Sequence, residues 1–162
     1  YADILEKSLN NEDEEILSAA IFSLGLIGDQ NSLENLLQLY EHPSARVRHQ
    51  LAVALGNYND ERSRKLLYKF LNDLEPNVRW DAAISLAKQN DNKGRRIILD
   101  LMDRNYLDSF PNVDQIEQNQ AIFAAIAASE KILDNEINEV LIDLMNNDIN
   151  MKVRQAARNV LK

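Results

Sequence analysis

The amino-acid sequence predicts an all-α solenoid built from two-helix repeats, and three observations carry this prediction. Residues 47–60 recur 31 positions later as residues 78–91 and 31 positions earlier as residues 16–29. A fixed period of this length is typical of solenoid proteins, in which each repeat is one supersecondary unit. Within each copy the apolar residues follow a helical period. The 162 residues include only 4 Gly and 3 Pro, which suits a helical chain with short connections.

A second series of helices follows the same spacing. Residues 34–40, 65–71 and 96–102 align with one another at intervals of 31 and are rich in leucine or isoleucine. The next such segment, residues 139–145, lies 43 positions after 96–102, so 12 residues have been inserted. Most of the inserted residues follow directly after the segment 96–102. A smaller part lengthens the next helix, which precedes the segment 139–145.

Local signals place the ends of the helices. Carboxylates in residues 12–15 favour the N-terminus of the first complete helix, because they complement its partial positive charge. Gly28 is expected to end that helix, and Asn31 and Ser32 to cap the next one. After a first helix within residues 1–9, the expected helices are 16–27, 33–40, 47–58, 61–71, 78–88, 95–102, 116–133, 139–145 and 153–161.

The period divides the chain into full and partial repeats of one domain. Because residues 1–9 match a second helix and the chain begins at Tyr1 without a Met, we expect it to be a fragment of a longer protein. The expected units are a half-repeat at 1–11, repeats at 12–43, 44–75 and 76–104, an insertion at 105–115, an enlarged repeat at 116–148 and a half-repeat at 149–162.

Composition narrows the classes of partner. The net charge of −8 and the pI near 4.8 argue against general binding to nucleic acids or anionic membranes, because the average surface potential repels polyanions. There is no cysteine, and we find no apolar run long enough to predict a membrane span. The compartment stays open, with the cytoplasm slightly favoured over an extracytoplasmic location, and we expect a monomer in isolation.

One recurring motif resembles a known family. The pattern Pro-x-Val-Arg-x-x-Ala-x-x-x-Leu-Gly is matched best where residues 76–79 (Pro-Asn-Val-Arg) and 151–154 open helices, with residues 45–48 close behind. This pattern resembles the bacterial HEAT-like repeat, the type first associated with phycobilisome lyase subunits. The resemblance covers the whole chain. It implies a right-handed α-α superhelix, with first helices on the convex side and second helices lining the concave side.

The resemblance also implies a role for the motif arginines, Arg48, Arg79 and Arg154. In the family this arginine bonds to acidic or carbonyl groups of the turns between repeats, which makes it structural. The candidate acidic partners in this sequence are Glu41, Asp73, Glu75 and Asp148.

Catalytic motifs are sparse. The two histidines, His42 and His49, do not supply the His-Glu pairs with which the related deoxyhypusine hydroxylase holds two irons. We find no metal-ligand spacing, phosphate-binding loop or nucleophile elbow. The sequence therefore predicts no catalytic residue, no metal and no cofactor, and lyase activity rests on the family resemblance alone.

Charge is unevenly distributed along the chain. Residues 61–104 contain ten Lys or Arg and seven Asp or Glu, and the basic residues recur in register. Stacked repeats place such positions side by side, so we expect a basic stripe on the second helices. Two interpretations are equally favoured: a solvated face that balances nearby carboxylates, or a concave surface that docks an acidic segment of a partner protein. The basic stripe consists of Arg62, Arg64, Lys65, Lys69, Lys93, Arg95 and Arg96, with Tyr68 near it.

The insertion is unusually apolar for a loop. It contains Tyr106, Leu107, Phe110, Pro111 and Val113. We favour the interpretation that it folds back as a plug over the groove or the core. The alternative is a partner-binding loop that acts through Tyr106 and Phe110, because long irregular loops often carry function.

Together these features predict a non-enzymatic protein-interaction scaffold. The first alternative is an enzyme or enzyme subunit of the bilin-lyase type, and the second is a nucleic-acid-binding helical-repeat protein.

Overall fold

The computed structural model describes residues 2–162, which form eleven α-helices and one short 3-10 helix. Five helices open the successive pairs: α2 (Glu14–Ile27), α4 (Ala45–Leu55), α6 (Pro76–Lys88), α9 (Gln115–Ser129) and α11 (Met151–Val160). The second helices are α1 (Ala2–Ser8), α3 (Gln30–Leu37), α5 (Glu61–Phe70), α7 (Arg95–Leu101, preceded by η1, Asn92–Gly94) and α10 (Asn135–Asn147). The insertion contributes α8 (Arg104–Asp108).

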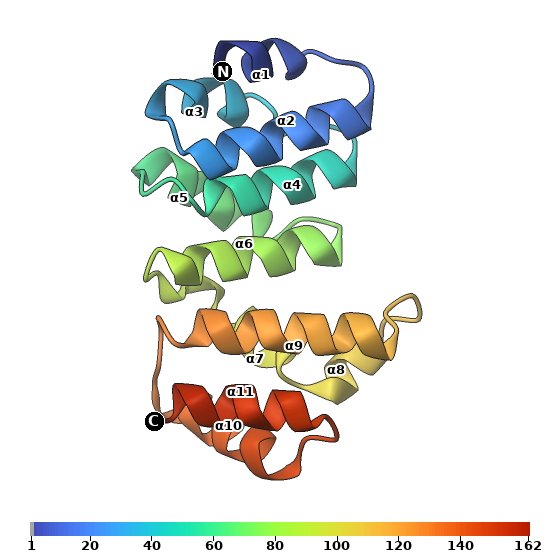
Figure 1. The fold of residues 1–162 in the computed structure, drawn as a ribbon, viewed down its shortest axis with the longest axis vertical. Helices are drawn as coiled ribbons and strands as arrows, with labels where there is room; N and C mark the ends of the chain where they lie inside the picture. The colour runs from blue at the N-terminus through green and yellow to red at the C-terminus, as the bar shows by residue number, and fades with distance from the viewer. Residues whose placement is uncertain (1) are drawn as a thin grey trace.

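The helices form two stacked layers. In Figure 1, α2, α4, α6, α9 and α11 lie one above another across the front of the molecule, with α5, α7 and α10 behind them. The two termini lie at opposite ends of the long axis. Each front helix contacts the next one in the stack, and α3 contacts α5 in the second layer. The predicted all-α, α-α superhelix is therefore confirmed, and we call these layers the first-helix layer and the second-helix layer.

Aspartates begin most of the helices. Asp13, Asp60 and Asp134 each accept a hydrogen bond from a backbone N–H in the first turn of the helix that follows. Such a cap satisfies one of the orphan donors of the helix N-terminus. Gly28 ends α2 in the left-handed conformation (φ 65°), as predicted. The predicted cap of the next helix was wrong, because Asp29 caps α3 and the helix therefore begins at Gln30 rather than 33.

The largest of the other differences between predicted and observed helix boundaries lie in the enlarged unit, whereas boundaries elsewhere differ by three residues or fewer, as at the ends of α3 (Leu37, predicted 40) and α4 (Leu55, predicted 58). The helix expected at 116–133 ends at Ser129, and the helix expected at 139–145 already begins at Asn135. Asp134 sets the second boundary, because its side chain accepts from the N–H of Ile137. Tyr1, the first residue of the expected N-terminal helix, lies outside the described residues.

Small residues bring the first helices close together in the N-terminal part. A Cβ added to Gly25 of α2 would lie 2.7 Å from both Cα and Cβ of Ala54 in α4. A Cβ added to Gly56 would lie 2.5 Å from Oγ of Ser85 in α6. The corresponding position of α6, another 31 residues on, is Ala87. At this position of the repeat, α6 therefore carries a methyl group, whereas the α2–α4 and α4–α6 contacts have a glycine there.

Buried side-chain hydrogen bonds reinforce the same contacts. The hydroxyl of Tyr58 donates to the carbonyl of Leu24 over 3.0 Å, and burial raises the pKa of Tyr58 to about 12. The hydroxyl of Ser85 donates to the carbonyl of Ala52 over 2.9 Å. These bonds join consecutive first helices across the stack.

The apolar core consists of two clusters that meet at α6. The first gathers side chains from α1 to α6 and the second from α6 to α11. Val78 and Leu86 of α6 belong to the first cluster, whereas Trp80 and Ala87 belong to the second. Helix α6 therefore couples the two halves of the solenoid.

The insertion packs against the second cluster. Leu107 of α8 is fully buried, and Phe110 and Val113 pack against the buried residues. The rings of Trp80 and Phe110 meet edge to face with centroids 5.1 Å apart. Trp80 Nε1 also donates to the hydroxyl of Tyr106 over 3.2 Å. The apolar side chains of the insertion thus contribute to the core.

Candidate protein-interaction surface

The first motif arginine is part of an inter-repeat network. Arg48 donates from Nε and Nη2 to the two carboxylate oxygens of Asp73, over 2.8 and 2.9 Å, and from Nη1 to the carbonyls of His42 and Pro43. Both side chains are mostly buried. The hydrogen bond to Asp73 raises the pKa of Arg48, and Arg48 in turn lowers the pKa of Asp73.

The other two motif arginines bond to turn carbonyls. Arg79 donates to the carbonyls of Asp73 and Leu74, and Arg154 donates to the carbonyl of Asp148. The structural role expected for all three arginines is therefore confirmed. Among the side chains of residues 4–162, Asp73 supplies the only carboxylate bond to these arginines, and neither Glu41 nor Glu75 pairs with them.

In the enlarged unit, Asn119 occupies the helix position that Arg48, Arg79 and Arg154 occupy in the other units. Arg104 instead forms the bonds to the turn between repeats. Its Nε and Nη2 bond to the carboxylate of Asp148 over 2.8 Å each, and Nη2 also donates to the side chain of Asn119. The side chain of Asp148 is only 2% exposed. The sequence prediction missed this pair. A signal for it does exist, because Asp148 precedes Arg154 by six residues, as Asp73 precedes Arg79.

The N-terminal part of the basic stripe is compensated by neighbouring carboxylates. Arg62 of α5 pairs with Asp60 over 3.0 Å and with Glu34 of α3. Arg64 pairs with Glu61 one turn away over 3.4 Å. The charges of these two stripe arginines are therefore balanced by carboxylates of the same chain.

The two lysines at the centre of the stripe lie over tyrosine rings. Lys69 Nζ lies 4.7 Å from the ring centroid of Tyr40, and Lys93 Nζ lies 4.0 Å from that of Tyr68. The Tyr68 hydroxyl donates to Asp91, a bond that raises the pKa of Tyr68. A cation–π contact positions an ammonium group without neutralising it. Lys65 is exposed, and it forms no ion pair with the side chains of residues 4–162.

The C-terminal part of the stripe reaches across to α10. Arg95 pairs with Asp134 and Glu136, which raise its pKa, and the pKa of Asp134 is lowered by Arg95. Arg96 pairs with Asp100 over 3.0 Å. The stripe residues therefore lie on α5, η1 and α7 of the second-helix layer, and among the stripe residues only the lysines form no ion pair within residues 4–162.

The two aromatic residues proposed as a binding site lie elsewhere. Tyr106 and Phe110 contact each other and Trp80, with ring centroids 5.1 to 6.4 Å apart. Both are partly buried in the second core cluster. Their ring contacts are with this cluster and not with the basic stripe.

Two hollows accompany these surfaces. One is a groove of about 560 Å³ between α7 and α10, which we call the α7–α10 groove. The other, of about 370 Å³, lies between α6 and α9 in the first-helix layer and is lined by Trp80, Ile84 and Ala121. At its edge His49 forms an ion pair with Asp81, which raises the pKa of His49.

Two further findings concern metals and membranes. Among the side chains of residues 4–162, no group of three or more His, Cys, Asp or Glu is arranged to hold a metal ion. In the same part of the chain, every helix is too short or too polar to cross a bilayer.

Stacked pairs of antiparallel helices with a shared core define a helical-repeat solenoid. The family description of HEAT repeats matches residues 2–87 and 33–108, and the chain belongs to this family. Comparison with curated proteins gives no match.

A solved structure shares the fold. The chain is similar to a chain in the complex of CpcE and CpcF of phycocyanin lyase from Nostoc sp. PCC7120, with 18% sequence identity and a TM-score of 0.73. The similarity covers 99% of this chain and 64% of that one. At this identity the likeness establishes the architecture alone.

Proposed function

We propose that the chain is a non-enzymatic scaffold that binds a partner protein through its second-helix layer. The observation that carries the proposal is the trio Lys65, Lys69 and Lys93, which are all exposed and lie in the basic stripe. Their charges are left over after the arginines have paired within the fold. Lys69 and Lys93 are held over tyrosine rings, which reduces the entropy that binding would cost. The similar phycocyanin lyase chain occurs in a complex of two subunits, which supports a role in binding protein.

The partner chemistry follows from these lysines. An acidic segment laid along α5 and η1 would bring its carboxylates to three ammonium groups and meet Tyr68 between them. Charge complementarity of this kind gives specificity and speeds association. The stripe arginines contribute less to such a contact, because each already has a carboxylate partner.

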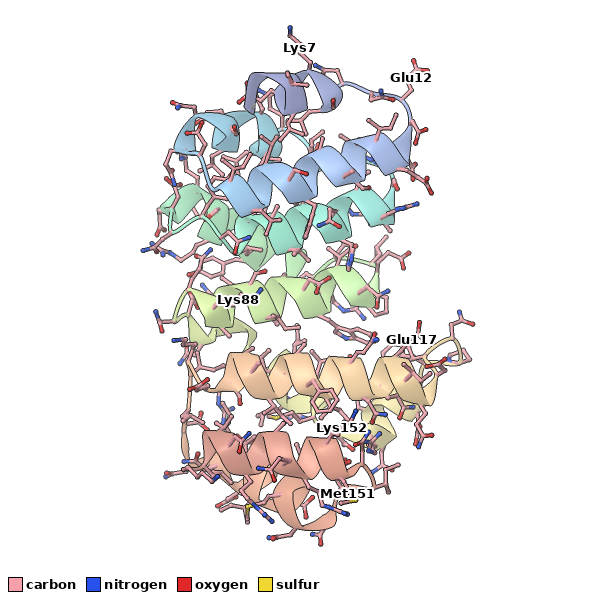
Figure 2. The ribbon with its side chains drawn as sticks, in the orientation of Figure 1. Lys7, Glu12, Lys88, Glu117, Met151 and Lys152 are labelled. Carbon is pink, nitrogen blue, oxygen red and sulfur yellow. The ribbon has the colours of Figure 1, made fainter. Side chains whose placement is uncertain are left out.

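A labelled poly-glutamate peptide tests this proposal. The triple variant Lys65→Glu, Lys69→Glu, Lys93→Glu reverses the free charges and leaves the arginine pairs in place. We expect it to weaken peptide binding by at least about tenfold in a fluorescence anisotropy titration. The matched control is Lys7→Glu, Lys88→Glu, Lys152→Glu, three exposed lysines elsewhere on the molecule (Figure 2) with the same change in net charge. Equal weakening by the two triple variants would refute the proposal.

The second candidate is a subunit of an enzyme of the bilin-lyase type, which the similarity to a phycocyanin lyase chain favours. It is tested by mixing the chain with a bilin and an apo-phycocyanin subunit and following the visible absorbance. A scaffold is expected to leave the spectrum unchanged, whereas chromophore attachment would change it.

A further inference from the structure

The α7–α10 groove combines an apolar floor with an acidic rim. Leu99 and Met102 line it from α7 and its C-cap, and Val140 and Leu144 line it from α10. The lining includes six carboxylates but only two cations: Asp100, Asp103, Glu136, Glu139, Asp143 and Asp148, with Arg96 and Arg104. Part of the second-helix layer is therefore acidic, next to the basic stripe.

Three of these carboxylates have no cation partner. Asp100, Glu136 and Asp148 are each paired with an arginine. Among the described residues, the remaining three, Asp103, Glu139 and Asp143, form no ion pair. Asp103 accepts a backbone hydrogen bond as the cap of α8, and Asp143 accepts one from the side chain of Asn147. These bonds are local and leave both negative charges uncompensated.

The arrangement on α10 is unfavourable for the isolated helix. Glu139 and Asp143 are four residues apart, so their like charges repel across one turn. Asp143 also lies in the C-terminal half of α10, where the helix dipole disfavours a negative charge. The helix has no basic residue in its last turn to offset this cost. An external cation in the groove would relieve both effects.

We propose that the α7–α10 groove binds a basic amphipathic segment of a partner protein. Its Lys or Arg side chains pair with Asp103, Glu139 and Asp143, and its apolar side chains cover Val140 and the exposed Ile149. A metal ion is a poorer occupant, because the described residues contain no group of three metal-binding side chains so arranged. Nucleic acid is repelled by the same carboxylates. This inference rests on the proposed scaffold function, to which it adds a second contact of opposite charge.

The test uses a fluorescein-labelled amphipathic peptide of Lys and Leu and a triple variant of the groove. Asp103→Asn, Glu139→Gln and Asp143→Asn remove the three charges and keep the side-chain shapes, and Asn still caps a helix. We expect binding of this peptide to weaken at least about tenfold in the triple variant and to weaken with added salt. We also expect its melting temperature to be equal to or above that of the wild type, because like-charge repulsion is removed.

The matched control removes three carboxylates outside the groove: Glu12→Gln, Glu41→Gln and Glu130→Gln, all exposed and outside every ion pair of residues 2–162. Its binding should stay within about twofold of the wild type. Equal weakening in the two triple variants, or no binding of the Lys and Leu peptide by the wild type, overturns the inference. Poly-glutamate binding is measured on the same samples, so a failure of the groove with intact poly-glutamate binding is distinguishable from failure of the scaffold proposal.

Discussion

The pair of Arg48 and Asp73 couples one repeat to the next through two charged side chains that are 15% and 9% exposed. Removing one member of a buried ion pair costs more stability than removing one member of a surface pair, because the remaining charge is left in a poorly solvated site. The exposed pair of Arg46 and Glu15, with side chains 56% and 77% exposed, offers a comparison on the adjacent turn.

We predict that Asp73→Asn lowers the free energy of unfolding at pH 7 by about 2 kcal/mol, because charge-assisted hydrogen bonds to Arg48 are lost. The pKa of Asp73 is lowered in the folded state. Its contribution is therefore fully present above the unfolded pKa of about 3.9 and is lost as the pH falls through the folded value. Urea denaturation at pH 2 to 7 should show the difference between wild type and variant shrinking toward acid pH.

The control for this prediction is Glu15→Gln, which removes the exposed pair and should change the free energy of unfolding by less than about 0.5 kcal/mol. A constant difference between Asp73→Asn and the wild type across the acid range would contradict the assigned charge coupling.

The sequence predicted the arginine network only in part. Arg48, Arg79 and Arg154 follow from the repeating motif, because the turn they bond to has the same length each time. Arg104 lies in the irregular unit, and its partner Asp148 is 44 residues away. The period identifies Asp148, which precedes Arg154 by six residues as Asp73 precedes Arg79, but it cannot identify Arg104, which lies outside the repeating motif.

At the scale of the helix, a tight contact between two first helices lies where Gly25 of α2 meets Ala54 of α4. An alanine inside a helix is usually more favourable than a glycine by about 1 kcal/mol. Here the added methyl would lie 2.7 Å from the Cα atom of Ala54, which cannot move without moving its helix.

We predict that Gly25→Ala destabilises the protein by about 1 to 3 kcal/mol despite its better helix propensity, because overpacking forces the backbones apart. Ser23→Ala on the same helix is the matched control and should be neutral or stabilising. Thermal unfolding followed by circular dichroism measures both, and a stabilised Gly25→Ala variant would show that α2 and α4 can separate freely.

The insertion gives a second prediction at this scale. Phe110→Ala removes a half-buried ring that contacts both Trp80 and Tyr106, so we expect a loss of about 1 to 3 kcal/mol, below the range for a fully buried ring. The control is Leu74→Ala. Leu74 is 91% exposed, so its truncation should leave the free energy of unfolding almost unchanged. If Phe110→Ala keeps full stability but abolishes partner binding, the insertion is a recognition loop instead.

The sequence predicted most helices but not α8, which has only five residues and shows no periodic pattern of its own. The apolar character of the insertion was evident from Tyr106 and Phe110. Their partner Trp80 was not, because it lies 26 residues before Tyr106 and faces the insertion only after α6 and α9 have stacked.

At the scale of the molecule, stability should decline toward both ends of the stack. Each central helix has neighbours on both sides, whereas α1 and α11 have one side open. In a solenoid, stability is approximately a sum of repeat and nearest-neighbour terms. We predict that amide hydrogen exchange is slowest in α4 and α6 and at least about tenfold faster in α1 and α11. Equal protection along the chain would instead indicate a single cooperative unit.

The charge pattern was also predicted only in part. Counting residues gave a positive segment at 61–104, and its stripe residues lie on α5, η1 and α7. The fold then places the carboxylates of Asp134 and Glu136 against Arg95 from 39 and 41 residues away. Because this pairing crosses the insertion, the sequence alone did not reveal that the stripe gives way to an acidic groove.

The replacement of Gly25 and Gly56 by Ala87 at the next position has a mechanical consequence. Repeats joined through glycine contacts behave as a stiff block, because their backbones leave no room to slide. The α6–α9 joint contains a methyl group, aromatic ring contacts and a hollow, so we expect it to flex more easily than the α2–α4 and α4–α6 joints. Lys65, Lys69 and Lys93 lie on one side of this joint, whereas the α7–α10 groove spans it, because α7 packs against α6 and α10 follows α9. A partner that grips both would therefore set the curvature of the solenoid by flexing it there.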